Sequence, residues 1–155
     1  MSLYISVEDP AQPDIIELLE IHLSLMRSIS PPDSVHALDL DGLRSSEITF
    51  WTARQTGTLV GCGALKEIGA THGEIKSMHV RDTARGQGVA AALVRTVLTE
   101  ANARQYQRLS LETGSQPQFA PARRLYSSFG FDECGPFGSY AEDPHSTFMT
   151  LQLRK

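Results

Sequence analysis

The chain of 155 residues has 41% hydrophobic and 21% charged side chains, the balance of a folded globular protein and not of a disordered one. Its 14 Lys and Arg against 18 Asp and Glu give a net charge of −4, which argues against nucleic acid binding through a general positive field. No apolar stretch of about 18 residues predicts a membrane helix, and the first residues lack the layout of a signal peptide. With only 2 cysteines there is no disulfide framework, so we expect a cytoplasmic protein without a membrane partner.

The first half of the chain predicts a strand, a long helix and a hairpin. Residues 3–7 alternate between apolar and polar side chains, as a strand does. Apolar residues recur at helical spacing over 13–28, and a second, short helix is expected over 35–40. Strands over 48–54 and 58–65 are close enough in sequence to pair as a hairpin.

The second half predicts strands that alternate with helices. The expected elements are a loop over 69–73, strands over 74–80 and 109–113, helices over 89–103 and 119–129, and a last strand pair over 131–138 and 147–153.

The turn between residues 80 and 89 is the most informative stretch. It reads Arg85-Gly86-Gln87-Gly88-Val89-Ala90, between a strand and a helix N-terminus, where free backbone N–H groups favour a phosphate. A P-loop is excluded because the Gly-Lys-Ser/Thr ending is absent. The spacing of Gly86, Gly88 and Ala91 fits a dinucleotide fingerprint, but three strands come before the one that leads into it, which is the wrong context. By itself the turn is equally compatible with an ordinary strand–helix connection.

Two motifs together resemble the GNAT superfamily of N-acetyltransferases. Arg85-x-x-Gly88-x-Ala90 resembles its Q/R-x-x-G-x-G/A signature, and Ala122-x-x-Leu125-Tyr126-x-x-x-Gly130-Phe131 resembles its second signature. Further stretches are similar to a bacterial subgroup of small acetyltransferases related to YsnE and PaiA; they are Phe50-Trp51, residues 61–66, 74–78, 111–114 and 134–138. The resemblance implies one α/β domain (α+β type) over residues 1–155. Its mixed, mostly antiparallel sheet has six or seven strands, with the fourth and fifth splayed apart, and about four flanking helices.

The resemblance also implies acetyl-CoA as cosubstrate. Residues 85–90 would cradle the pyrophosphate, because N–H groups and the helix dipole favour it and small side chains allow close approach. The pantetheine arm would insert between the splayed strands. The residues expected to bind acetyl-CoA are Met78, His79, Val80, Arg85, Gly86, Gln87, Gly88, Val89, Ala90 and Tyr126.

For proton transfer the resemblance points to Tyr126 and Glu74. Tyr126 occupies the tyrosine of the second signature, which donates a proton to the CoA sulfur, and Glu74 occupies a strand start where some members place a general base. A packed helix tyrosine and a solvated carboxylate paired with Lys76 are the alternatives. Strict alternation would place Glu74, Lys76, Met78 and Val80 on one face of the strand. His79 would then point to the other face, where it is a fallback base, as is Glu112.

The acceptor is the least defined part of the hypothesis. His36 and Tyr140 are the candidate pocket residues, and the amine, on a small molecule or a peptide, is unidentified. The five histidines show no metal-ligand spacing, so we expect no metal, and a homodimer is left open. The main rival to an enzyme that works by direct attack in a ternary complex is a non-catalytic acyl-CoA sensor on the same scaffold.

Overall fold

The structure is a computed structural model that describes residues 2–36 and 38–153. Its strands are β1 (Leu3–Val7), β2 (Ile48–Gln55), β3 (Thr58–Gly69), β4 (His72–Val80), β5 (Arg108–Gly114), β6 (Asp132–Cys134) and β7 (Ser146–Gln152). Its helices are α1 (Pro13–Ile29), α2 (Leu40–Leu43), α3 (Val89–Ala103) and α4 (Ala120–Ser128), with 3-10 turns η1 (Pro32–Ser34), η2 (Asp82–Ala84) and η3 (Pro117–Phe119).

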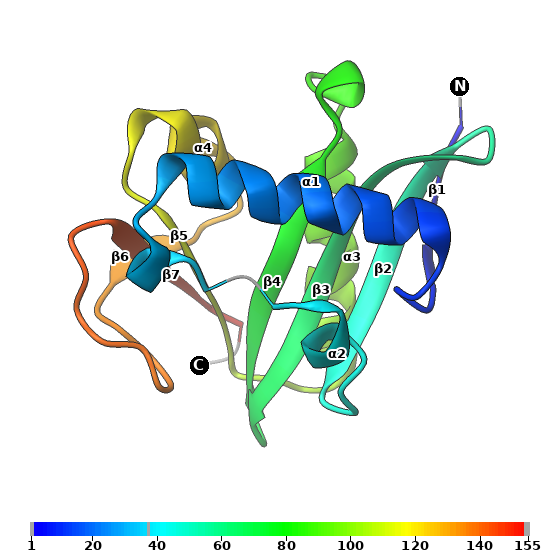
Figure 1. The fold of residues 1–155 in the computed structure, drawn as a ribbon. Helices are drawn as coiled ribbons and strands as arrows, with labels where there is room; N and C mark the ends of the chain where they lie inside the picture. Colours follow the sequence, from blue (N-terminus) through cyan, green and yellow to red (C-terminus); the bar gives the residue numbers. More distant parts are fainter. Residues whose placement is uncertain (1, 37, 154–155) are drawn as a thin grey trace.

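One seven-stranded sheet organises these elements, in the order β1-β2-β3-β4-β5-β7-β6. All neighbours are antiparallel except β4 and β5, which run parallel. In Figure 1, α1 crosses in front of the sheet and α3 lies behind it. The predicted fold class, a mixed and mostly antiparallel sheet flanked by helices, is confirmed.

Two apolar cores hold the three layers together. Behind the sheet, Val89, Leu93 and Val97 of α3 pack against the strands and against Tyr126 of α4. In front, Ile15 and Leu18 of α1 pack with residues of α2, β2 and β3 in a smaller cluster. Because successive strand residues point to opposite faces, neighbouring residues of one strand divide between the two cores.

Several predicted boundaries are corrected by the structure. The helix expected over 35–40 is wrong: α2 begins at Leu40, where Asp39 caps it by accepting the N–H of Gly42 at 2.8 Å, and residue 37 lies outside the described residues. The loop expected over 69–73 is only two residues long, because β3 continues to Gly69 and β4 begins at His72. The strand expected over 131–138 is confined to Asp132–Cys134. The loop that follows it proves to be part of the site.

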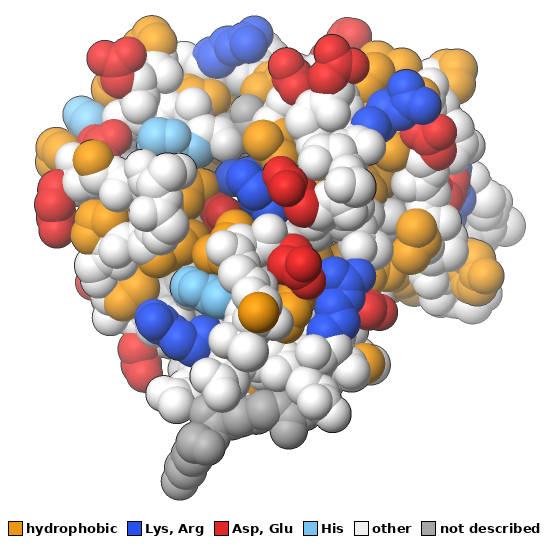
Figure 2. Space-filling model, turned by 90° about the horizontal axis from the view of Figure 1, so that it is seen from below, with side chains coloured by type: hydrophobic (Ala, Val, Ile, Leu, Met, Phe, Trp, Pro, Cys, Tyr) orange, Lys and Arg blue, Asp and Glu red, His pale blue; other side chains and the backbone are white. Residues whose placement is uncertain are grey.

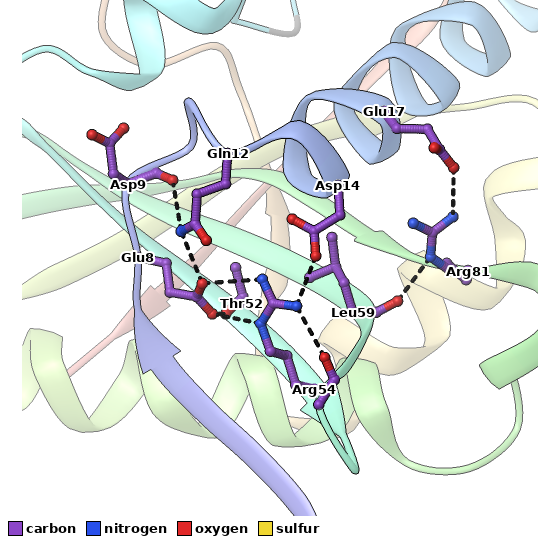
Figure 3. A network of polar contacts seen from close by, with 10 residues as sticks. Glu8, Asp9, Gln12, Asp14, Glu17, Thr52, Arg54, Leu59 and Arg81 are labelled. Atoms are coloured by element: carbon purple, nitrogen blue, oxygen red, sulfur yellow. Dashed lines mark hydrogen bonds and ion pairs between the residues drawn. The ribbon is translucent and has the colours of Figure 1, made fainter.

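An arginine anchors the start of α1 to the sheet. Arg54 of β2 donates to Glu8 from Nε at 2.9 Å and to Asp14 from Nη1 at 2.8 Å, and Thr52 donates to the same Glu8 carboxylate (Figure 3). The Arg54 guanidinium lowers the pKa of Glu8 to about 2, although burial opposes the shift. A second ion pair, Arg81 to Glu17, ties α1 to the end of β4. These contacts fix α1 over the sheet, which matters because α1 forms one wall of the site.

The sheet opens between β4 and β5. Their parallel pairing covers only four residues of each strand and ends at Ile75 and Leu111, although both strands continue. The predicted splay of the fourth and fifth strands is confirmed. No helix within residues 2–36 and 38–153 has the length and apolarity needed to cross a membrane. Figure 2 shows a face on which basic, acidic and apolar side chains are interspersed, without a continuous field of one sign.

Candidate active site

A cavity of about 640 Å³ occupies the opening between β4 and β5. That volume lies within the range of small-molecule sites. Its walls come from α1, the segment after η1, the ends of β4 and β5, the first turn of α3, and η3 with α4. The lining is mainly apolar, with a few titratable side chains at defined points: His22, His36, Glu74, Lys76, His79, Arg85, Glu112, Tyr126 and Tyr140.

The turn before α3 forms one end of this cavity. Gly86 and Gly88 have φ of 77° and 81°, a left-handed conformation that glycine adopts without strain. A Cβ at either position would meet nothing within 4 Å, so packing is not what requires a glycine there. The first helical bond runs from Ala92 to the carbonyl of Gly88 at 3.0 Å, which leaves the earlier N–H groups of α3 without an acceptor in the helix. The turn therefore presents free donors toward an open space.

Five of the six predicted cradle residues line the cavity: Arg85, Gly86, Gly88, Val89 and Ala90. Gln87 is not among the lining residues; its amide contacts Gln55 and the carbonyl of Thr83. The Arg85 guanidinium pairs with Asp82 at 3.0 Å, and both side chains are exposed. The positive charge of Arg85 is thus close to the cavity, but its side chain is exposed to solvent and is not held in place by packing.

A bulge in β4 changes which residues share a face. Ser77 has φ of 55°, unusual for a non-glycine residue, and the register with β3 shifts there, from Ala64 opposite Lys76 to Cys62 opposite His79. Strict alternation was therefore wrong for this strand. Glu74, Lys76 and His79 face the α1 side of the sheet, whereas Met78 and Val80 pack with the α3 core. The bulge brings His79 to the same side as Glu74.

Glu74 is the centre of a compact polar cluster. It is only 4% exposed, and its Oε2 accepts the hydroxyl of Tyr140 at 2.5 Å and the Nζ of Lys76 at 3.3 Å. Lys76 also donates to the Tyr140 hydroxyl at 2.9 Å. Burial raises the pKa of Tyr140, and the Glu74 carboxylate raises it further. The predicted pairing of Glu74 with Lys76 is present, but the carboxylate is buried and not solvated.

Aromatic rings fix the Tyr140 side chain above this cluster. Its ring lies 5.0 Å from His36, 5.1 Å from Phe137 and 5.4 Å from Phe148, measured between centroids. The loop that carries it is tied to η1, because Ser34 donates to Asp143 at 2.6 Å. The structure thus brings the two predicted acceptor residues, His36 and Tyr140, together at one end of the cavity.

Glu112 of β5 also lines this end of the cavity. Burial raises its pKa, and the nearby Ser146 hydroxyl, His36 and Lys76 lower it in part. Two carboxylates, Glu74 and Glu112, therefore flank the opening from the two splayed strands, with the Lys76 cation near both.

A buried histidine pair lies farther along the cavity. Nδ1 of His22, on α1, is 3.1 Å from Nδ1 of His79. One ring must donate and the other accept, so the two adopt different protonation patterns at these nitrogens. Burial lowers the pKa of each to about 4, so both are uncharged at neutral pH. The apolar stripe of α1 favours a packed histidine at position 22; the structure shows His22 buried, and it also places it in the cavity wall.

Tyr126 projects from α4 into the remaining wall. It is 5% exposed and packs edge-on against Phe131 at 5.8 Å. Burial raises its pKa, so the phenol stays protonated at any physiological pH. The packed helix tyrosine is therefore present, and Tyr126 also lines the cavity, where its role as proton donor stays a prediction.

The cavity between the splayed strands is lined at one end by the glycine turn before α3 and at the other end by Glu74 and Glu112. The acetyltransferase (GNAT) family model matches residues 15–131. YsnE of Bacillus subtilis, an uncharacterized N-acetyltransferase, is 49% identical over 97% of this chain and 100% of its own length. The chain belongs to the GNAT family and is an acyltransferase.

Solved structures agree on the fold. A Klebsiella pneumoniae protein classed as an acyl-CoA N-acyltransferase superposes with a TM-score of 0.83 at 26% identity, covering 97% of both chains. A GNAT acetyltransferase from Elizabethkingia anophelis, solved with acetyl-CoA bound, superposes with a TM-score of 0.70 at 20% identity, covering 97% of this chain and 98% of its own.

Proposed function

We propose that the protein transfers the acetyl group of acetyl-CoA to a primary amine by direct attack, with both substrates bound in the one cavity. The observation that carries the proposal is the continuity of that cavity. It runs from the free donors of the α3 N-terminus to the carboxylates Glu74 and Glu112. A long donor with phosphates at one end and a reactive thioester at the other fits such a cavity. The GNAT relative solved with acetyl-CoA supports the choice of donor.

The geometry supports a set of residues for binding the donor. Gly86, Gly88 and the first turn of α3 would hold the pyrophosphate by N–H groups and the helix dipole. The edge of β4 beyond Ile75 no longer pairs with β5, so the backbone of Met78, His79 and Val80 is available to the pantetheine arm. A backbone N–H there would polarise the thioester carbonyl, a contribution of a few kcal/mol to barrier lowering.

Glu74 and Tyr126 divide the proton transfers. Glu74 takes a proton from the amine nitrogen as this forms its bond to the carbonyl carbon. Tyr126 donates its phenolic proton to the sulfur as the carbon–sulfur bond breaks, and solvent later returns a proton from Glu74 to Tyr126. The raised pKa of Tyr126 suits a donor that must stay protonated before the step. His36 and Tyr140 bound the space where the amine would enter.

Incubation of the protein with acetyl-CoA and a panel of amines, followed by free thiol release, tests the proposal. The panel should include aliphatic monoamines, diamines, aromatic amines, amino acids and a short peptide. We expect amine-dependent thiol release that Glu74→Gln lowers by about 10²-fold or more. Saturable acetyl-CoA binding with no acetylation of any amine would favour the acyl-CoA sensor. The absence of acetyl-CoA binding would refute both.

A further inference from the structure

The loop between β6 and β7 places the Tyr140 side chain next to Glu74, although the two residues are far apart in sequence. Tyr140 lies 66 residues after Glu74, yet its hydroxyl is 2.5 Å from Glu74 Oε2. We propose that Tyr140, supported by Lys76, is a positioning residue that holds Glu74 as an oriented carboxylate. The inference rests on the proposed function, in which Glu74 is the base.

The three groups form a closed arrangement. The Tyr140 hydroxyl donates to Glu74 Oε2 and accepts from Lys76 Nζ at 2.9 Å, and Lys76 reaches the same Oε2 at 3.3 Å. Every hydrogen bond of the carboxylate to the described residues therefore falls on Oε2, and Oε1 makes none. One oxygen is held by the protein and the other is left for a proton from the acceptor.

The Tyr140 side chain is held in place by its neighbours. Rings of His36, Phe137 and Phe148 surround that of Tyr140 within 5.4 Å, and Lys76 Nζ lies 5.6 Å from the ring centroid. The Ser34–Asp143 hydrogen bond fastens the loop to η1. A fixed O–H donor stabilises a carboxylate in its charged form and in one orientation, which is what a general base requires.

Other charged and titratable groups face Glu74 as well, and any test must hold them constant. They are Lys76 on its own strand, Lys66 on β3, His72 at the start of β4, Glu112 on β5, and His36 after η1. None of these changes in a Tyr140→Phe variant, which removes one hydroxyl and keeps the ring.

Tyr106→Phe provides a matched control. The Tyr106 hydroxyl donates to Glu67 Oε1 at 2.7 Å, and its ring is 1% exposed, so it too is a buried tyrosine bonded to a glutamate. It lies outside the residues that line the cavity. Both substitutions remove a hydrogen bond from a tyrosine to a carboxylate, but only Tyr140→Phe removes one to Glu74.

The test compares kcat and kcat/KM of the wild type, Tyr140→Phe, Glu74→Gln and the double variant, with acetyl-CoA binding measured separately by calorimetry. Tyr140→Phe should have no further effect in the Glu74→Gln background, because the two residues act through one carboxylate, and Tyr106→Phe should keep the wild-type kcat. With the panel amine that gives the highest kcat/KM, Tyr140→Phe should lower kcat about tenfold with little change in KM for acetyl-CoA. The acid limb of its kcat/KM profile should move to higher pH.

An unchanged kcat in Tyr140→Phe would overturn the inference, as would equal effects of the two tyrosine variants or the same loss of kcat in the Glu74→Gln background. This failure is distinguishable from failure of the proposed function. The latter would appear as full activity of Glu74→Gln, or as no thiol release by the wild type. If Tyr140→Phe lowers solubility, Lys76→Gln gives a second route. It removes the cation that supports the hydroxyl, and a kcat that does not fall there would also count against the inference.

Discussion

Replacing Glu8 should change how the protein responds to acid. Glu8 accepts from Arg54 and Thr52, and the pKa of its carboxyl falls from 4.5 to about 2. Because the folded-state pKa is lowered, the stabilisation is fully present above pH 4.5 and is lost as the pH falls toward 2. At about 1.36 kcal/mol per pH unit, a shift of about 2.5 units corresponds to about 3 kcal/mol. Because the Glu8–Arg54 pair is partly exposed to solvent, which screens the interaction, we expect it to contribute about 2 kcal/mol to the free energy of unfolding.

Urea unfolding of the wild type and of Glu8→Gln at pH 7, 5, 4 and 3 measures this contribution. The variant should lose about 2 kcal/mol at pH 7, and its difference from the wild type should shrink as the pH falls below 4.5 and be smallest at pH 3. Glu20→Gln is the control, because Glu20 is exposed on α1 and forms no ion pair with the described residues. If the wild-type and Glu8→Gln curves stay parallel from pH 7 to 3, the Arg54 network does not stabilise the fold as described.

Three further substitutions test other parts of the site. Tyr126→Phe should lower kcat by about 10²-fold without weakening acetyl-CoA binding, and a decrease of less than about threefold would reject the proton-donor role. Gly88→Val should weaken acetyl-CoA binding strongly in calorimetry, because it strains a φ of 81° and places a side chain in the cradle; unchanged affinity would reject the cradle. Ser77→Gly should raise the free energy of unfolding by about 1 kcal/mol. Ser77 combines a φ of 55° with a buried hydroxyl that has no partner among the described residues, and a decrease would show that the hydroxyl is needed for folding.

Local patterns were enough to predict much of the fold. Periodicity identified α1 and α3, with α3 predicted at its observed bounds of Val89 and Ala103. The glycine turn before α3 was recognised because Gly86 and Gly88 are the residues that adopt positive φ most readily. Such features depend on residues that are close in sequence, so they can be predicted from one amino-acid sequence.

The remaining features depend on contacts that sequence spacing does not show. The bulge in β4 falls on Ser77, and a serine in a left-handed conformation has no signal comparable to that of a glycine. The alternation drawn through that point therefore placed Met78 and Val80 on the wrong face. In the same way, Tyr140 was predicted only as a pocket residue. Its bond to Glu74 arises because β7 returns beside β5 and carries the loop across the opening.

A calorimetric titration of the wild-type protein with acetyl-CoA, with NADH as the comparison ligand, tests the central claim most directly. The splayed strands and the α3 turn predict saturable binding of acetyl-CoA at one site per chain, and no binding of the dinucleotide. No heat of binding with acetyl-CoA, or binding of NADH in its place, would contradict the assignment of this cavity.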